Sequence, residues 1–517
     1  RQDGRRTRHF TGYLTVGAQA ADHLFYWLVE SEGEPAKDPV VLWLTGGPGC
    51  SSMDALIYEH GPFTFTPSDP DDIPASDIEL RENRWSWSKA ATMVYVDSPV
   101  GAGLSFSSDE REYATDDEQT TDHLLEFLVA LLGREFPHLR ARDLYIAGES
   151  YAGVYVPLLA RKVMDHNART GTPSSEVLHL RGYAVGNGVA DDAADGNGQP
   201  EFAYGMGLMD PPTHARLQEV CAGNYWNATP GSACASELRQ AYDTFYWVNP
   251  YDILEDCHTY AQPRAAGGEQ GAQAAGAQAG SRALRAQGRS AHVSMRAPSR
   301  AGGATATPST TQTAVQQQAS AGNAGEGSSS TARSIVRTAL AQLPHPLQWP
   351  LGGVLPPVGQ PVRSWHGLVG HVVPCADRRV ALAWMNREEV RAALHVPPAS
   401  QLNWQPCSDK LHYRTGPVSM TALHAQLVER GLRALVYSGD HDFVVPFTST
   451  RDWVYRLGLR QEQPYKPWTV DGQVAGFTAR FSPGLVFATV KGAGHMVPQT
   501  SPERGLHLIT RFLYDTL

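Results

Sequence analysis

The stretch Leu144-Tyr-Ile-Ala-Gly-Glu-Ser150-Tyr-Ala-Gly-Val-Tyr-Val-Pro157 decides the fold. Its apolar beginning predicts a buried strand, the Gly-Glu-Ser-Tyr run predicts a tight turn, and the remainder is compatible with a helix. A nucleophilic serine can sit on such a strand-to-helix elbow, with its hydroxyl pointing outward. The pattern G-x-S-x-G is not met in full, because Ala152 replaces the second glycine and Gly153 follows one residue later. Ser150 is therefore either a nucleophile or a simple helix N-cap.

The length and composition of the chain indicate one large core with additions. At 517 residues it exceeds the usual size of one domain, and 42% of its residues are hydrophobic and 19% are charged. The chain has no run of about 18 apolar residues, so we expect no membrane-spanning segment. The net charge of -10 argues against a nucleic-acid partner, since phosphate backbones are bound by clustered Lys and Arg.

The cysteines and one sequon bear on the cellular compartment. The six cysteines are Cys50, Cys221, Cys234, Cys257, Cys375 and Cys407. They form no C-x-x-C pair, which argues against a zinc site and favours disulfides in an oxidising compartment. Asn227-Ala-Thr229 is a sequon, so we expect Asn227 to be glycosylated. Because the chain opens at Arg1 without Met, we expect a secretory leader to have been removed and the protein to be vacuolar, lysosomal or extracellular.

A second apolar run, 39–45, ends in the loop Gly46-Gly-Pro-Gly-Cys-Ser-Ser52. A run that is apolar throughout predicts a strand buried on both faces. The loop does not fit a phosphate cradle, because no Gly-Lys-Ser/Thr follows and Pro48 lacks a backbone N–H. The remaining alternatives are a plain turn and an oxyanion hole, in which Gly47 and Tyr151 would donate their backbone N–H groups.

Strands and helices are expected to alternate along much of the chain. Further apolar runs cover 93–98, 178–185, 434–438 and 485–490. With helix-compatible segments between them, they predict an α/β fold with a mostly parallel central sheet and helices on both faces. Two aromatic and β-branched runs, 10–16 and 23–30, predict antiparallel strands at the edge of this sheet.

The regular pattern fails after Asn187-Gly188, which indicates an insertion. The expected division is 1–189 and 376–517 for the core, 190–260 and 349–375 for an inserted cap, and 261–348 for a linker. The linker segment contains no Phe, Trp or Tyr and consists mainly of Ala, Gly, Gln, Ser and Thr. Burial of so little apolar surface would not offset the conformational entropy lost when the segment becomes ordered. We therefore expect a disordered, protease-sensitive segment that is excised.

Three polar residues follow the ends of three predicted strands, in the order Ser150, Asp442 and His495. Open α/β sheets place their sites at this edge, and the order Ser, acid, His is that of α/β-hydrolases. In acyl transfer, His takes the proton of the serine and a buried carboxylate fixes the imidazole tautomer. Asp440 competes with Asp442 for the acid position, and we favour Asp442. We therefore expect a catalytic triad on an α/β-hydrolase fold.

Long blocks of the chain resemble those of serine carboxypeptidases, the peptidase S10 family. They are Trp43-Leu-Thr-Gly-Gly-Pro-Gly-Cys-Ser-Ser52, Gly148-Glu-Ser-Tyr-Ala-Gly153, Gly439-Asp-His-Asp442 and Gly494-His-Met-Val-Pro498. Blocks that resemble the plant serine carboxypeptidase I type are Tyr58-Glu-His-Gly-Pro-Phe63, Asp97-Ser-Pro-Val-Gly-Ala-Gly103 and Asn224-Tyr-Trp-Asn-Ala-Thr229. The resemblance covers most of the chain apart from the linker.

The resemblance implies roles for individual residues. The triad of the family falls on Ser150, Asp442 and His495, and its oxyanion donors fall on Gly47 and Tyr151. Its site for the substrate carboxylate falls on Trp43, Thr45, Gly46, Glu59 and Glu149, and its S1′ pocket includes Met496. The implied disulfides are Cys50–Cys407, Cys221–Cys234 and Cys257–Cys375. The last of these would hold the two sides of the linker together after its excision.

Position 45 departs from the family pattern, where we expect Asn. The Thr hydroxyl can donate one hydrogen bond, whereas an amide donates two. Threonine at this position is similar to carboxypeptidase-like acyltransferases, while Glu149 differs from the Asp expected in many of them. An acyltransferase is therefore the nearest alternative function.

Together these patterns predict a serine carboxypeptidase that releases C-terminal residues from peptides and proteins through an acyl-enzyme at acidic pH. The acidic preference follows because Glu59 and Glu149 can donate hydrogen bonds to a substrate carboxylate only when protonated, and close carboxylates raise each other's pKa. No metal or cofactor is implied. A non-catalytic protective or scaffolding protein is the alternative from another class, and a homodimer is left open.

Overall fold

The computed structural model describes residues 7–65, 78–109, 113–245, 248–257, 378–397, 402–415 and 419–517. The predicted linker 261–348, the predicted return of the cap at 349–375, and Cys375 lie outside these residues. The division into core, cap and linker therefore stays a prediction.

Within the described ranges the main sheet has eleven strands, with ten along its path in the order β1-β2-β6-β3-β9-β10-β12-β15-β14-β13 and β7 paired to β2. In chain order the strands on the path are β1 His9–Val16, β2 Asp22–Val29, β3 Val40–Leu44, β6 Thr92–Val96, β9 Leu144–Glu149, β10 Leu180–Gly186, β12 Arg433–Gly439, β13 Arg460–Val470, β14 Gln473–Ser482 and β15 Leu485–Val490. β7 is Phe106–Ser107. Two small two-stranded sheets contain β4 Phe63–Phe65 with β5 Leu80–Glu82, and β8 Ala114–Asp116 with β11 His412–Arg414.

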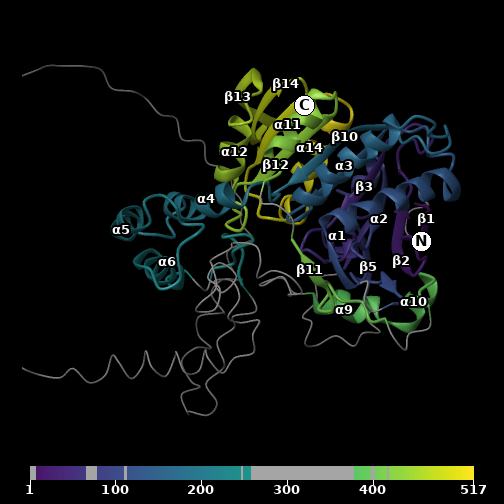
Figure 1. Cartoon of the computed structure of the whole chain (residues 1–517), viewed down its shortest axis with the longest axis horizontal. Coiled ribbons are helices and arrows are strands. Elements are labelled where there is room, and N and C mark those ends of the chain that lie inside the picture. The colour runs from purple at the N-terminus through teal and green to yellow at the C-terminus, as the bar shows by residue number, and fades with distance from the viewer. Residues whose placement is uncertain are drawn as a thin grey trace, which may run out of the picture. The chain divides into compact units, whose positions relative to one another are not determined.

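The strands from β6 to β15 along this path are all parallel, as predicted for the centre of the sheet. β1 and β2 add an antiparallel edge on one side, where it was expected. β13 and β14 add a second antiparallel edge, which the sequence analysis did not predict. The mostly parallel α/β sheet is thus confirmed, with antiparallel strands at both edges (Figure 1).

Helices cover both faces of the sheet (Figure 1). In the described part of the chain the helices are α1 Ser52–Tyr58, α2 Asp117–Ala130, α3 Ala152–Ala168, α4 Asp192–Gly205, α5 Pro211–Cys221, α6 Ala233–Asp243, α9 Arg379–Met385, α10 Glu388–Ala393, α11 Thr421–Glu429, α12 Phe447–Tyr455, α13 Val497–Thr500 and α14 Pro502–Leu513. A 3-10 turn covers Trp87–Lys89, and a π-helical turn, Leu131–Glu135, extends α2. Apolar residues of α2, α3 and α11 join one core cluster, and those of α1 and α14 join another.

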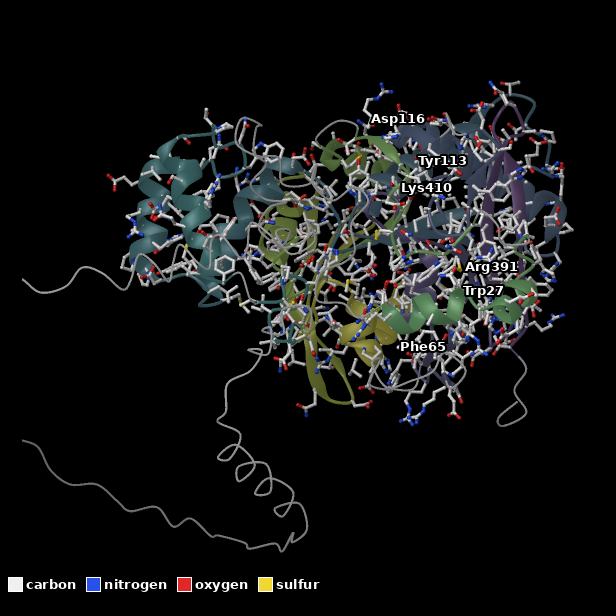
Figure 2. All side chains as sticks on the ribbon, turned by 90° about the horizontal axis from the view of Figure 1, so that it is seen from below. Trp27, Phe65, Tyr113, Asp116, Arg391 and Lys410 are labelled. Atoms are coloured by element: carbon white, nitrogen blue, oxygen red, sulfur yellow. A yellow bond between two sulfur atoms is a disulfide. The ribbon has the colours of Figure 1, made fainter. Side chains whose placement is uncertain are left out.

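Alternate side chains of the central strands enter the two clusters. Ile146 on β9 belongs to the cluster under α2 and α3, whereas its neighbours Tyr145 and Ala147 belong to the cluster under α14. This period of two explains why residues 144–147 of the strand are all apolar. Trp27 and Phe65, both in the second cluster, are among the rings labelled in Figure 2.

The region 190–260 contributes α4, α5 and α6, which form an apolar cluster of their own. A disulfide between Cys221 and Cys234 joins the end of α5 to the start of α6. Phe443 also belongs to this cluster, and its ring centroid lies 5.7 Å from that of Tyr242 and 5.4 Å from that of Phe245. Helices α4, α5 and α6 therefore pack against the loop that follows β12 through Phe443.

A second disulfide, Cys50–Cys407, joins residues 357 positions apart in the chain and anchors the glycine-rich loop after β3. The resemblance implied both disulfides. Its third pair, Cys257–Cys375, stays a prediction, because Cys375 lies outside the described residues. In the described part of the chain, none of the helices combines the length and apolar character that a bilayer crossing requires.

Truncation of a side chain at the centre of the sheet should destabilise the protein strongly. Ile146 is 0% exposed, so Ile146→Ala removes apolar burial and leaves a cavity, a change that costs about 2–5 kcal/mol. We expect a clear fall in the thermal unfolding temperature. Val474→Ala on β14, where the side chain is 37% exposed, is the control and should change stability by less than about 0.5 kcal/mol. Equal effects of the two substitutions would contradict the assignment of β9 to the core.

Candidate active site

Ser150 lies on a sharp turn between β9 and α3, with a φ of 58°. This left-handed conformation is rare for residues other than glycine, and its strain is typical of functional sites. The Ser150 N–H donates to the Gly186 carbonyl over 3.2 Å, and the Ser150 carbonyl accepts from Val189 N over 2.9 Å. Tyr151 is the N-cap of α3, and its side chain makes no cap hydrogen bond. The turn therefore presents Ser150 without using it as the N-cap that the sequence left as an alternative.

Small residues around the elbow let three backbone segments meet. A Cβ at Gly148 would stand 2.4 Å from the Leu44 carbonyl oxygen, and one at Gly153 would stand 2.2 Å from the Val189 carbonyl oxygen. Contacts this short do not occur between real atoms, so both positions require glycine. This explains the departure from G-x-S-x-G: the close approach falls at residue 153, and Ala152 is accommodated.

The glycine-rich loop lies directly against the elbow. A Cβ at Gly46 would stand 2.5 Å from Tyr151 N and 2.7 Å from Ser150 Cβ. Gly47 has a φ of 115°, which glycine adopts without strain. Backbone without side chains thus borders the space beside Ser150, as an oxyanion hole requires.

His495 and Asp442 form a buried pair. His495 Nδ1 lies 2.7 Å from Asp442 Oδ2, and the two residues are 3% and 0% exposed. When the Nδ1–H of the neutral imidazole donates to Asp442, Nε2 is left as an acceptor. His495 Nε2 is buried and has no hydrogen-bond partner among the described residues. In this arrangement Nε2 could accept a proton from a hydroxyl group, as a general base does.

Asp442 is held by three further donors. Its Oδ2 accepts from Asn187 Nδ2 over 2.8 Å and from Val445 N over 3.2 Å, and its Oδ1 accepts from Val444 N over 2.8 Å. Asp440 instead accepts from Gly492 N over 2.7 Å, and its Oδ1 lies 3.6 Å from His441 Nδ1. The structure therefore pairs Asp442, the residue favoured from the sequence, with His495.

The sequence analysis missed Asn187. This residue is 0% exposed and has a φ of 39°, and its Oδ1 accepts from Gly439 N over 2.9 Å while its Nδ2 donates to Asp442. Asn187 thus orients the acid from the end of the neighbouring strand. The available signal was an Asn between two glycines at the end of a strand, since Asn tolerates the left-handed conformation.

The two glutamates implied for the carboxylate site lie together. Glu59 and Glu149 are 3% and 4% exposed. Burial raises the pKa of Glu59 to about 8, and burial together with the adjacent Glu59 charge raises the pKa of Glu149 well above its usual value. At neutral and acidic pH this pair therefore retains protons that it can donate.

Neighbouring groups complete this region. Trp43 Nε1 donates to Thr45 Oγ1 over 3.0 Å, which leaves the threonine hydroxyl proton for another acceptor. The Tyr251 ring lies 5.0 Å from the His495 ring and packs against Met496. Burial raises the pKa of the Tyr251 hydroxyl, and the nearby carboxyl groups of Asp442 and Glu149 raise it further. The Asp442–His495 pair and the glutamate pair therefore border the same region.

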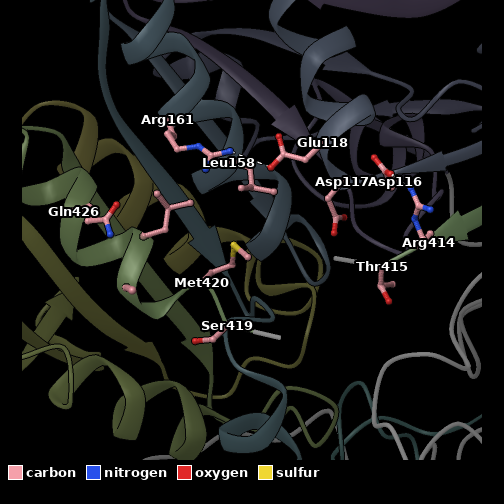
Figure 3. Close-up of a pocket in the computed structure, with 12 residues that line it drawn as sticks. Asp116, Asp117, Glu118, Leu158, Arg161, Arg414, Thr415, Ser419, Met420 and Gln426 are labelled. Carbon is pink, nitrogen blue, oxygen red and sulfur yellow. Dashed lines mark hydrogen bonds and ion pairs between the residues drawn. The ribbon is translucent and has the colours of Figure 1, made fainter. Parts of the chain in front are cut away.

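A second residue missed from the sequence is Asp117. Its Oδ1 accepts from Tyr151 Oη over 3.0 Å and from Tyr413 Oη over 2.7 Å. Asp117 also lines a pocket of about 370 Å³ between α2, α3 and α11, and Figure 3 shows Asp117 and Met420 among the residues that line it. Only the backbone of Tyr151 was assigned a role, and its side chain proves to be anchored at the N-terminus of α2.

Sequence comparison matches residues 2–515 to serine carboxypeptidases, peptidase family S10. The chain belongs to the serine carboxypeptidase family. It is 36% identical to serine carboxypeptidase 1 of Hordeum vulgare over 509 residues, which are 98% of this chain and 89% of the relative. It is also 36% identical to serine carboxypeptidase-like 21 of Arabidopsis thaliana over 512 residues, 98% of this chain and 91% of that relative. The resemblance stated from the sequence blocks is thereby confirmed.

The fold agrees with this membership. The structure of Kex1(delta)p, a prohormone-processing carboxypeptidase from Saccharomyces cerevisiae, superimposes with a TM-score of 0.62 at 18% identity and covers 98% of this chain and 92% of its own. The α/β-hydrolase fold is confirmed, and members of this family are serine hydrolases. Within the described residues no group of three or more His, Cys, Asp or Glu side chains is arranged to hold a metal ion.

Loss of the Asn187 side chain should slow the reaction of Ser150. A hydrogen bond to a charged group contributes about 1.5–3 kcal/mol, so Asn187→Ala should lower the rate of Ser150 labelling by a fluorophosphonate about tenfold to a hundredfold. Asn167→Ala is the control, because Asn167 bonds the Leu178 backbone from the other end of α3. A labelling rate equal to that of the unsubstituted protein would show that Asn187 does not position Asp442.

Proposed function

We propose that this chain is a serine carboxypeptidase that releases C-terminal residues from peptides and proteins through an acyl-enzyme. The observation that carries the proposal is the placement of a buried, proton-retaining glutamate pair directly beside the elbow. Glu149 immediately precedes Ser150, so a substrate carboxylate bound at the pair lies close to the proposed nucleophile. An enzyme that acts on internal bonds would have no use for such a pair.

The proposed reaction uses Ser150, His495 and Asp442. His495 Nε2 takes the hydroxyl proton as Ser150 Oγ attacks the last peptide carbonyl, and Asp442 stabilises the imidazolium through Nδ1. The N–H groups of Gly47 and Tyr151 stabilise the developing oxyanion. His495 then gives the proton to the leaving amine, the C-terminal amino acid departs, and water hydrolyses the ester on Ser150 by the same steps in reverse.

Recognition of the chain end is assigned to the glutamate pair and its neighbours. Protonated Glu59 and Glu149 donate to the terminal carboxylate, and Thr45 and the Gly46 backbone contribute further donors. Trp43 fixes the Thr45 hydroxyl by donating to its oxygen. Met496, which packs against Tyr251, forms a wall of the S1′ pocket for the departing side chain.

An acyltransferase with the same triad is the second candidate. The observation that favours it is Thr45, whose single hydroxyl proton replaces the two amide protons expected from Asn. Such an enzyme would move the acyl group from Ser150 to an alcohol instead of water. A non-catalytic protein that keeps the fold for protection or scaffolding is the third candidate. The buried pair of His495 and Asp442 argues against it.

The cellular setting proposed for this enzyme is the secretory pathway, with a vacuolar, lysosomal or extracellular destination. Two disulfides support an oxidising compartment. Asn227 is exposed between α5 and α6, where a glycan has access to it. Excision of 261–348 is retained as part of this proposal.

The choice between the candidates can be tested with paired substrates. The protein should shorten an N-blocked dipeptide at pH 5, and it should not transfer acyl groups from a glucose ester to an added alcohol. Ser150→Ala should abolish release, with a loss of at least about 10³-fold in kcat. Faster transfer from the glucose ester would favour the acyltransferase, and absence of both activities with no fluorophosphonate labelling would favour the non-catalytic candidate.

Hydrolysis of peptides should be faster at pH 5 than at pH 8. A carboxyl group whose pKa is raised donates below that pKa and loses its proton as the pH rises through it, whereas a peptide carboxylate is ionised above about pH 4. Donation to substrate is therefore present in acid and lost toward pH 8. Glu59→Gln keeps an N–H donor at every pH and should flatten this decline. A kcat/KM that rises steadily from pH 5 to pH 8 would contradict the assigned role of the pair.

A further inference from the structure

Arg378 is a buried cation in the region of the two glutamates. It precedes α9, and its side chain is 5% exposed. Its Nε lies 2.8 Å from Asp54 Oδ1, and its Nη2 donates to Gln499 Oε1 over 3.3 Å. Its guanidinium carbon lies 4.2 Å from the centre of the Tyr58 ring. A charged group so deeply buried requires the partners that these contacts supply.

The partners of Arg378 belong to two segments that carry residues proposed to bind the substrate. These segments are α1, which leads to Glu59, and α13, which follows Met496. Asp54 and Tyr58 are four residues apart on α1 and so share one face of that helix, and Glu59 follows as its C-cap. Gln499 lies in α13, three residues after Met496. The Arg378 side chain thus joins the segment that ends in Glu59 to the segment that begins at the S1′ wall.

Several titratable groups face the glutamate pair. They are Asp54 on α1, Tyr95 on β6, Tyr437 on β12, Tyr251 after α6, and Arg378 before α9. Among the described residues, Arg378 is the cation whose charge acts on both Glu59 and Glu149. The charge of Asp54 acts on the same two carboxyl groups in the opposite sense.

The charge balance explains why this cation matters to substrate. With both glutamates protonated, the pair of Asp54 and Arg378 is neutral, and a bound substrate adds one negative charge. Burial raises the pKa of Asp54, and the Arg378 guanidinium beside it favours the ionised form of this carboxyl group. Removal of the Arg378 charge would take away this support, and it would also remove the attraction of the buried guanidinium for the incoming substrate carboxylate. Charges in a medium of low dielectric constant interact strongly, so binding would weaken.

We propose that Arg378 is a positioning residue for carboxylate recognition, whose charge, opposed by Asp54, sets the electrostatic balance in which Glu59 and Glu149 receive the substrate. This proposal rests on the proposed carboxypeptidase function. Arg378 is not assigned a direct contact with substrate. It acts through the two glutamates and through the potential of the buried region.

A purely structural role for the ion pair predicts a different result. If Arg378 and Asp54 only fasten α1 to the segment before α9, loss of either partner should impair the enzyme in the same way. If their charges act on the glutamates, loss of the two partners should move the pH dependence in opposite directions. Removing the cation raises the pKa of the glutamates, whereas removing the anion lowers it.

The experiment measures kcat/KM for an N-blocked dipeptide between pH 4 and pH 9 in the full chain and in Arg378→Gln, Asp54→Asn and the double variant. Arg378→Gln should raise KM at pH 5 roughly fivefold to tenfold and move the alkaline midpoint upward by about half a unit to one unit. Asp54→Asn should move this midpoint downward by a similar amount. The double variant, which leaves no unpaired charge, should return close to the unsubstituted profile.

Two controls accompany this series. p-Nitrophenyl acetate has no carboxylate, so its profile gives the reference midpoint of the triad for each variant. Arg433→Gln removes a cation that also lies over a ring, with its guanidinium carbon 4.9 Å from the centre of Phe512, and its peptide profile should stay unshifted. Arg378→Lys keeps the charge and should keep the midpoint, which tests the proposal even where Arg378→Gln does not fold.

The outcomes separate the two proposals. Failure of the unsubstituted protein to release C-terminal residues would overturn the proposed function. Release by the unsubstituted protein, with shifts of the same sign or no shifts in Arg378→Gln and Asp54→Asn, would overturn the role of Arg378 alone. A shifted midpoint in Arg378→Lys equal to that in Arg378→Gln would also overturn it.

Discussion

The whole site depends on how closely three backbone segments approach one another at the elbow. A side chain at Gly148 would collide with the carbonyl of Leu44, and a side chain at Gly153 would collide with the carbonyl of Val189. A side chain at Gly46 would collide with the elbow itself. A single methyl group at these points would separate the strand, the helix and the loop. Because the three segments touch, a strained serine and bare N–H groups share one small space.

The fold was largely predictable because its central strands are buried on both faces. Residues 144–147 are apolar at every position, and the structure shows consecutive residues of this part of β9 entering different core clusters. The antiparallel pair β13 and β14 was not predicted. β13 is mostly exposed and contains Pro464 and Pro467, residues that weaken any strand prediction and are tolerated at a sheet edge.

The candidate site was predictable where a residue type had to follow a strand, and not where it depended on register. Ser150, Asp442 and His495 could be proposed from their positions after apolar runs. The role of Asn187 could not, because it arises from the pairing of β10 with β12, which brings Asn187 beside Gly439 and Asp442. The Asp117 contact with Tyr151 likewise joins helices whose packing no local pattern encodes.

The position of Phe443 links the helices after β10 to the residue beside the proposed catalytic acid. Phe443 packs among α4 and α6, and Asp442 immediately precedes it. Exchange of these helices for those of a relative is therefore constrained. The transplanted helices need a matching apolar site for this ring, since otherwise the neighbouring carboxylate would lose its alignment.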